Sequence, residues 1–127
     1  MSLGQDQTVT AVEPALQATY AVITSPEEHA VVRGTVPVIG TAVDPNFWKY
    51  EVHYAPEPNP SNQWVLIGTI HETQVTDGLL ETWETTIIPD GMYSLRVRDV
   101  NRTGNYTEVY VRGIMVANAE PTETPVP

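Results

Sequence analysis

The chain has 127 residues, of which sixteen are acidic and six are basic, and it carries a net charge of −10. This length allows one domain with one modest core, and the negative charge disfavours nucleic acid and anionic membrane surfaces as partners, because both would repel it. Since the chain contains no cysteine, disulfides and thiolate metal sites are excluded.

The two ends of the chain differ from its middle. Residues 1–19 show no sustained period of 2 or 3.6 and predict a linker, whose first residues 1–3 resemble a cloning remnant. Residues 119–127 are a tract of Thr, Pro and Glu that cannot bury enough apolar surface to fold, which predicts an extended spacer. Neither a run of about 18 apolar residues nor a secretory signal is visible. We therefore expect no direct membrane insertion and a domain at 20–118 that belongs to a longer polypeptide.

Between the ends, strands and turns alternate about every ten residues, which is typical of a β-sandwich or barrel. The content of Val, Ile, Thr and aromatic residues also favours strands. The predicted strands are, in chain order, 20–24, a short edge piece at 31–34, 36–43, 47–55, 64–70, 79–88, 91–99 and 106–116. A rigid loop at 56–62 should protrude, and a polar loop should end at the turn-forming pair Asp77 and Gly78.

Alternation in the predicted strand 47–55 assigns its two faces. Tyr50, Val52 and Tyr54 should point into the core. The intervening polar side chains should face solvent: Lys49, Glu51 and His53. In the strand 79–88, Trp83 should point inward.

The last two strands predict a hairpin with a defined register. Alternation points Tyr93, Leu95 and Val97 inward. The polar residues Ser94, Arg96 and Arg98 should then face solvent. Placing Val109 and Val111 inward as well requires the pairs Leu95–Val111 and Val97–Val109, because a slip of one residue would expose both valines.

Two contacts follow on the outward face of this hairpin. Arg98 should lie opposite Glu108 and form an ion pair, and Arg96 should lie opposite Tyr110 and form a cation–π contact. Gly113 interrupts the alternation, which predicts a β-bulge.

Segment 90–95, Asp-Gly-Met-Tyr-Ser-Leu, resembles the tyrosine corner of immunoglobulin-like sandwiches, in which a Tyr at the start of a strand hydrogen-bonds to nearby backbone. Further matching positions are 40–42, Phe47, 50–54, Trp64, Leu80, Trp83 and 99–105. Together they are similar to the immunoglobulin-like or fibronectin type III-like modules of bacterial surface proteins, such as those appended to penicillin-binding proteins and secreted subtilisin-like proteases.

This resemblance covers about 20–118 and implies an all-β, immunoglobulin-like antiparallel sandwich of about seven strands. Leu95 stands where antibody domains carry a cysteine, so a bacterial module fits better than an antibody domain. The family implies a role in spacing, adhesion or substrate presentation rather than in catalysis.

The catalytic motifs that the sequence partly matches are incomplete. Segment 71–75 begins like the His-Glu-x-x-His motif of zinc proteases, but Val75 occupies the second histidine position. The only lysine, Lys49, is preceded three residues earlier by Asn46, so a Ser-x-x-Lys nucleophile is missing. The histidines fall in different segments, and we expect all three on the surface: His29, His53 and His71. We therefore predict that the chain is not an enzyme.

Asp99, Asn101 and Asn105 place oxygen ligands in one short loop, which makes them a candidate Ca²⁺ site. Turn chemistry is the favoured interpretation, because Asp, Asn and Gly are also the residues that a hairpin loop requires. No other cofactor is expected.

Trp48, Tyr106 and Tyr110 are candidate ligand-binding residues, because exposed aromatic rings could form a stacking platform for sugars. Trp48 should lean outward beside the loop at 56–60. Trp64 and Trp83 are assigned instead to the core, which a small domain must fill with its large side chains.

The sequence therefore predicts a non-catalytic accessory module of a larger extracellular or cell-envelope protein. Its expected partners are neighbouring domains of the same polypeptide and cell-wall polysaccharide or protein. The alternative function is a carbohydrate-binding module that uses its exposed aromatic residues. A third hypothesis is a homodimer that pairs edge strands.

Overall fold

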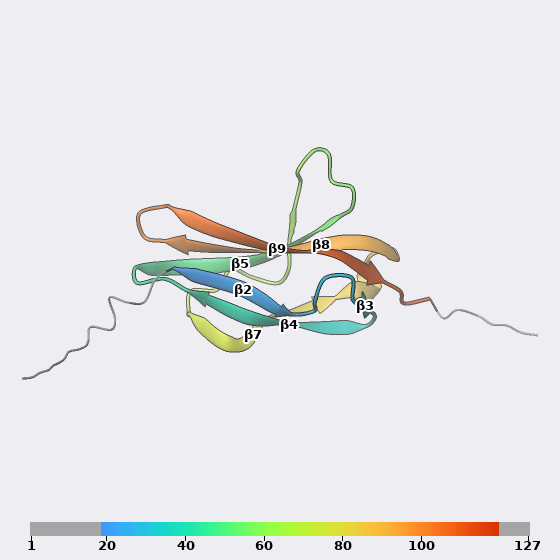
Figure 1. Ribbon diagram of the computed structural model, residues 1–127, viewed down its shortest axis with the longest axis horizontal. Helices are drawn as coiled ribbons and strands as arrows, with labels where there is room; N and C mark the ends of the chain where they lie inside the picture. Colours follow the sequence, from blue (N-terminus) through green and yellow to red (C-terminus); the bar gives the residue numbers. More distant parts are fainter. Residues whose placement is uncertain (1–18, 120–127) are drawn as a thin grey trace, which may run out of the picture.

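The computed structural model describes residues 19–119, which form two layers of β-sheet (Figure 1). The elements are, in chain order, β2 (Tyr20–Ser25), β3 (Val31–Val32), β4 (Thr35–Val43), β5 (Phe47–Pro56), β6 (Val65–Leu66), β7 (Val75–Glu84), the 3₁₀ turn η2 (Thr85–Ile87), β8 (Gly91–Asn101) and β9 (Tyr106–Val116). The predicted linker and spacer lie, apart from Thr19 and Ala119, outside the described residues. Within residues 19–119, no helix is long and apolar enough to cross a membrane.

The strands form a three-stranded sheet and a five-stranded sheet. Their orders are β2-β4-β7 and β3-β9-β8-β5-β6. The short strand β3 pairs with β9 in parallel, and the other pairings are antiparallel. The prediction of an all-β sandwich is thereby confirmed.

The core lies between the two sheets, as the alternation predicts. Tyr50 and Val52 of β5 are buried, and Tyr54 packs against the core. Trp83 of β7 is buried as predicted, and its ring centroid lies 5.8 Å from that of Tyr54 and 6.0 Å from that of Tyr93. Each such side chain contributes roughly 1.5–3 kcal/mol by leaving water, and in the absence of cysteine this burial holds the fold.

The predicted register of the β8–β9 hairpin is confirmed. Leu95 pairs with Val111 and Val97 pairs with Val109, so Arg98 lies opposite Glu108. The bulge is confirmed as well. Between the pairs Tyr93–Ile114 and Leu95–Val111, β9 contains one residue more than β8, and Gly113 there has a φ of 73°.

Tyr93 forms the hydrogen bond expected at the start of this hairpin. Its hydroxyl donates to the carbonyl oxygen of Pro89 at 2.6 Å. The bond ties β8 to the turn that precedes it.

Two strand predictions were wrong. The strand predicted at 64–70 is reduced to β6, and β7 begins at Val75, so Asp77 and Gly78 lie inside a strand rather than at the end of a loop. The reason is a register shift between β4 and β7, where Asp77 has a φ of 48° and its amide donates to Thr41 Oγ1 at 2.9 Å. A turn-forming pair here shapes an irregularity within the sheet.

Candidate functional site

The candidate site is the face of the five-stranded sheet that points away from the three-stranded sheet, which we call the outer face. The sequence predicts a solvated surface here, and this is wrong for three side chains. Ser94 is only 2% exposed, His53 6% and Arg96 7%. A loop at 57–64, which we call the covering loop, contacts Ser94 through Glu57 and Arg96 through Trp64. Figure 1 shows it, in green, rising above the five-stranded sheet.

The covering loop is fastened to the sheet by its first residue. The amide of Glu57 donates to the carbonyl of Met92 at 2.9 Å. Its carboxylate accepts hydrogen bonds from the Ser94 hydroxyl and, at 2.9 Å, from the amide of Gly113. The bulge at Gly113 therefore also provides an anchoring point for the loop.

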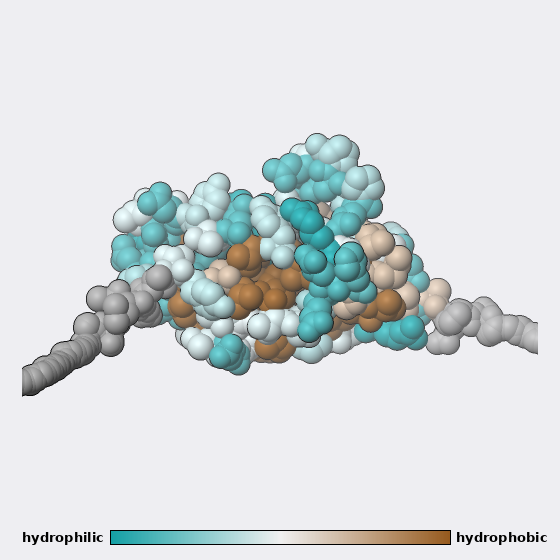
Figure 2. All heavy atoms as spheres, in the orientation of Figure 1, coloured by the Kyte–Doolittle hydropathy of each residue, from teal (hydrophilic) through white to brown (hydrophobic). Residues whose placement is uncertain are grey.

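The far part of the loop is held by its own side chains. Asn59 accepts from the Gln63 amide and donates to the Gln63 carbonyl, both at 3.0 Å. The indole Nε1 of Trp64 donates to Asn62 Oδ1 at 2.8 Å. In Figure 2 the surface of this loop is hydrophilic, and apolar side chains gather between the two sheets.

A row of charged groups crosses the outer face from β5 to β8. Glu51 accepts from Lys49 Nζ at 3.2 Å and from His53 Nε2 at 3.0 Å. Arg96 Nε donates to His53 Nδ1 at 3.2 Å. Because a guanidinium only donates, Nδ1 must accept and the proton of a neutral His53 lies on Nε2. Burial, with the charge of Arg96, lowers the pKa of His53, although Glu51 acts in the opposite direction.

Glu108 joins the charged groups of β8 and β9. It accepts from Arg98 Nε at 2.6 Å and from the Tyr110 hydroxyl at 3.0 Å, and Arg96 Nη1 lies 3.6 Å away. Burial raises the pKa of Glu108, but the hydrogen bonds from Arg98 and Tyr110 and the two positive charges outweigh it, so the net shift is downward.

Aromatic rings stack on these cations. Arg96 lies 4.5 Å from the ring centroid of Trp64, and Arg112 lies 4.5 Å from that of Tyr110. Arg96 and Tyr110 are cross-strand partners as predicted, but the guanidinium of Arg96 stacks on Trp64, because the covering loop brings that indole over it.

A pocket of about 380 Å³ lies between the covering loop and the outer face. We call it the loop pocket. The residues that line it include Glu57, Asn59, Asn62, Trp64, Tyr110 and Arg112. The Trp64 and Tyr110 ring centroids are 5.8 Å apart. The site therefore combines aromatic surface with hydrogen-bonding groups of both kinds.

Two of the tryptophans do not lie where the sequence predicted them. Trp64, assigned to the core, lies on the outer face instead. Tyr106 and Tyr110 are exposed there, and Arg98 lies 4.7 Å from the Tyr106 ring centroid. Trp48 is 36% exposed, but it follows Phe47 at the start of β5, whereas the loop begins after the other end of that strand. The prediction that Trp48 lies beside the loop is therefore wrong. The aromatic side chain that lies next to Trp64 of the loop is that of Tyr110.

The predicted metal ligands do not share one cluster. Asp99 is fully buried between the sheets, whereas Asn105 is exposed. Asn101 Oδ1 accepts from the Thr103 amide at 3.0 Å, which is the Asx turn that a hairpin loop uses. Within residues 19–119 no group of three or more His, Cys, Asp or Glu could hold a metal ion.

Asp99 and two of the three histidines, His53 and His71, are more buried than expected. Neither carboxyl oxygen of Asp99 accepts a hydrogen bond of normal geometry among the described residues, and the nearby Val43 amide interacts with the group only weakly. Burial, reinforced by the charge of Asp44, raises the pKa of Asp99 to about 7, although the Val43 amide acts in the opposite direction. Of the histidines, His29 is exposed as predicted, and His71 is half-buried and stacks on Tyr50 at 4.7 Å.

Sequence reasoning missed Trp64, Arg112 and the burial of His53. The contacts that define them cross from β5 and its following loop to β8 and β9, far apart in the chain. For His53 the sequence did offer a signal: a polar residue that lies opposite an arginine on a neighbouring strand is a candidate for a contact with it.

No family model matches the chain, and no curated protein matches it. Among solved structures it is similar to the crystal structure of an engineered protein, with 18% sequence identity and a TM-score of 0.52 over 87% of this chain. The chain spans 22% of the length of that protein. At this identity the likeness concerns the fold alone.

Proposed function

We propose that the chain is an immunoglobulin-like, non-catalytic module of a larger extracellular or cell-envelope protein, and that it contacts its partners through the outer face. The partners are neighbouring domains of the same polypeptide and cell-wall polysaccharide or protein.

The immunoglobulin-like assignment is supported by strand order. Strands β2, β4 and β7 correspond to A, B and E of such sandwiches, and β5, β8 and β9 to C, F and G. The Tyr93–Pro89 bond at the start of β8 corresponds to the tyrosine corner.

The observation that carries the interaction role is the concentration of cations on the outer face. Four of the six basic residues of a chain with net charge −10 lie there: Lys49, Arg96, Arg98 and Arg112. Exposed aromatic rings accompany them. Arginine and tyrosine are enriched at the centres of protein interfaces.

The absence of catalysis is supported by the arrangement of the titratable groups on this face. His53 is held between Glu51 and Arg96, and Glu108 is held by Arg98 and Tyr110. Side chains held by such contacts keep fixed partners, which suits a structural hydrogen-bond network better than proton transfer to a substrate.

Carbohydrate binding is the second candidate. It is favoured by the loop pocket, where Trp64 and Tyr110 present rings beside hydrogen-bonding side chains. Sites of this composition suit small polar ligands.

Sedimentation tests the interaction role. The 127-residue chain is incubated with insoluble peptidoglycan and with the extracted surface proteins of a cell envelope. We expect co-sedimentation that weakens in Arg98→Glu and persists in Arg102→Glu, a matched charge reversal in the β8–β9 loop. Equal binding by both variants would place the contact elsewhere, and a hydrolase activity lost in a point variant would refute the non-catalytic role.

A further inference from the structure

We propose that the loop pocket binds a saccharide unit that carries a carboxylate, with Arg112 as the anion partner and with Trp64 and Tyr110 as the stacking surface. This rests on the proposed role as a binding module and names the ligand class.

The pocket has the size and the order of a ligand site. Its volume of about 380 Å³ falls within the range of small-molecule sites, about 300–1,000 Å³. Its wall is already organised, because the Asn59–Gln63 and Asn62–Trp64 hydrogen bonds hold the loop in place. A ligand therefore does not need to order the loop, and the entropic cost of binding is reduced.

Arg112 is the basic residue of the outer face that is left for a ligand. Lys49, Arg96 and Arg98 each have an ion pair with Glu51 or Glu108. Within residues 19–119, the Arg112 side chain has no carboxylate within ion-pair distance, and its guanidinium lies 4.5 Å from the centroid of the Tyr110 ring. None of the guanidinium N–H groups of Arg112 donates a hydrogen bond within residues 19–119, so these donors are available to a carboxylate.

The rest of the pocket fits a polyol. The Trp64 and Tyr110 rings offer apolar surface to the C–H face of a sugar ring. Glu57 accepts from Ser94 and Gly113 with one carboxylate oxygen, and no hydrogen bond within residues 19–119 uses its other oxygen, which is left to accept from a sugar hydroxyl. The pocket thus offers a donor and an acceptor beside its two rings, as binding of a sugar acid requires.

Net charge distinguishes a sugar acid from an acidic peptide. A chain with net charge −10 repels a partner with densely spaced carboxylates. A sugar acid presents one carboxylate per ring on an otherwise neutral body, so Arg112 can neutralise it locally.

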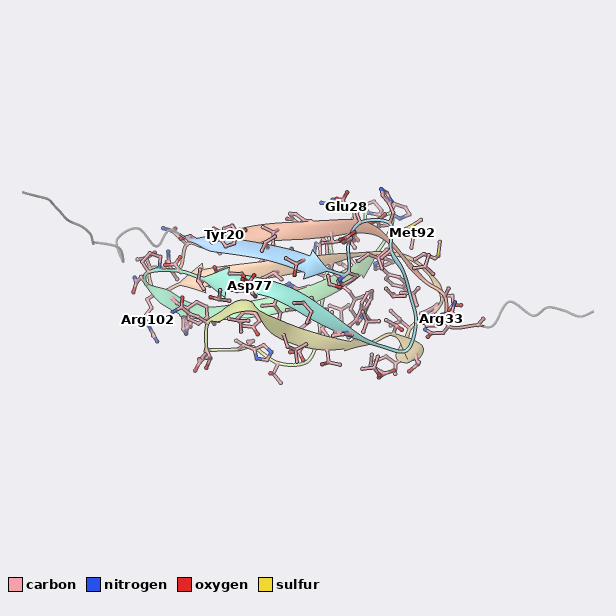
Figure 3. The ribbon with its side chains drawn as sticks, turned by 60° about the horizontal axis from the view of Figure 1, so that its bottom comes forward. Tyr20, Glu28, Arg33, Asp77, Met92 and Arg102 are labelled. Atoms are coloured by element: carbon pink, nitrogen blue, oxygen red, sulfur yellow. The ribbon has the colours of Figure 1, made fainter. Side chains whose placement is uncertain are left out.

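The test is a calorimetric titration of the 127-residue chain with a glucose oligomer that carries one glucuronic acid unit and with the all-glucose oligomer of the same length and linkage. We expect the acidic oligomer to bind about tenfold more tightly or better. Arg112→Gln should remove that preference and leave the neutral oligomer unaffected. Arg102→Gln is the matched control and should behave as the parent chain. Figure 3 places Arg102 at the opposite end of the molecule from Met92, beside which the loop is anchored.

Two further variants protect the test from misfolding. Trp64→Ala should weaken the binding of both oligomers, whereas Glu28→Gln, at an exposed position outside the pocket, should bind both as the parent chain does. Thermal unfolding checks the fold of each variant. Equal affinity for the two oligomers, an unchanged preference in Arg112→Gln, or no heat at millimolar ligand would each overturn the assignment.

Sedimentation separates this failure from failure of the proposed function. If Arg112→Gln and Trp64→Ala still co-sediment with the cell-wall material as the parent does, the interaction role stands and the saccharide subsite is wrong. If the parent itself does not co-sediment but shows the acidic preference, the subsite stands and the wider role is wrong.

Discussion

Arg98 and Glu108 lie ten residues apart in the chain and meet across the β8–β9 hairpin, where Nε donates to Oε2 at 2.6 Å. Glu108 also neutralises Arg96, which is almost fully buried. One carboxylate thus stabilises two neighbouring guanidinium groups, and its loss would leave both positive charges without this shared counter-ion.

We therefore expect Glu108→Gln to lower the free energy of unfolding by about 1–2 kcal/mol, as measured in urea, because a charged hydrogen-bond acceptor is removed. The pKa of Glu108 is lowered in the folded state, so its contribution is present above the unfolded pKa, 4.5, and is lost as the pH falls through the folded pKa. The variant should lack this acid-dependent loss. Glu28→Gln, at an exposed position, is the control, and equal pH profiles for all three proteins would contradict the expectation.

The hairpin was predictable because the alternation of Leu95, Val97, Val109 and Val111 permits only one register with all four side chains buried. The outer face was not. Alternation predicts on which face of the sheet Arg96 lies, but it does not predict whether a loop covers that face. Only the pairing of β5 with β8 and the seating of Trp64 over Arg96 decide it.

Asp99 shows the converse. It lies two residues beyond Val97 on the inward side of β8 and is fully buried, a position that strand alternation indicates but that the sequence analysis did not assign to it. The polar side chain and the nearby Asn residues favoured a loop instead. Side-chain polarity was the misleading signal there, and strand parity was the correct one.

Tyr93→Phe should destabilise the domain by about 1 kcal/mol, because the Pro89 carbonyl loses a hydrogen-bond donor while the ring and its packing on Trp83 remain. Thermal and urea unfolding measure the change. Tyr20→Phe removes a hydroxyl from an exposed ring and should be neutral. If the two variants were equally stable, the hydroxyl of Tyr93 would contribute nothing to the corner.

His53 should titrate below its ordinary pKa of 6.5, because burial and the charge of Arg96 oppose its protonation. A folded pKa that is lowered means that the folded state binds fewer protons, so this group costs stability as the pH falls below 6.5. Two-dimensional NMR of the imidazole nitrogens measures the titration and should find the proton of the neutral ring on Nε2. A proton on Nδ1 would contradict the hydrogen bond from Arg96. His53→Asn supplies the assignment of the signals.

Asp99→Asn should stabilise the domain at neutral and higher pH. The folded-state pKa of Asp99 is about 7, above its ordinary value of 3.8, so the folded state binds the extra proton. Below the unfolded pKa this group has no effect. As the pH rises from 3.8 to 7, stability is progressively lost, and above 7 the full penalty remains.

Because one pKa unit corresponds to about 1.36 kcal/mol, we expect the substitution to raise the free energy of unfolding at pH 8 by about 2 kcal/mol or more, and to have little effect at pH 3.5. Urea unfolding across this range measures both, with Glu72→Gln, at an exposed position, as the control. The same titration tests the Ca²⁺ hypothesis. If Asp99 were a metal ligand, Ca²⁺ would stabilise the parent at pH 8 and the asparagine variant would be the less stable protein. A more stable variant that is indifferent to Ca²⁺ and EDTA would leave burial of an unpaired carboxyl group as the cause.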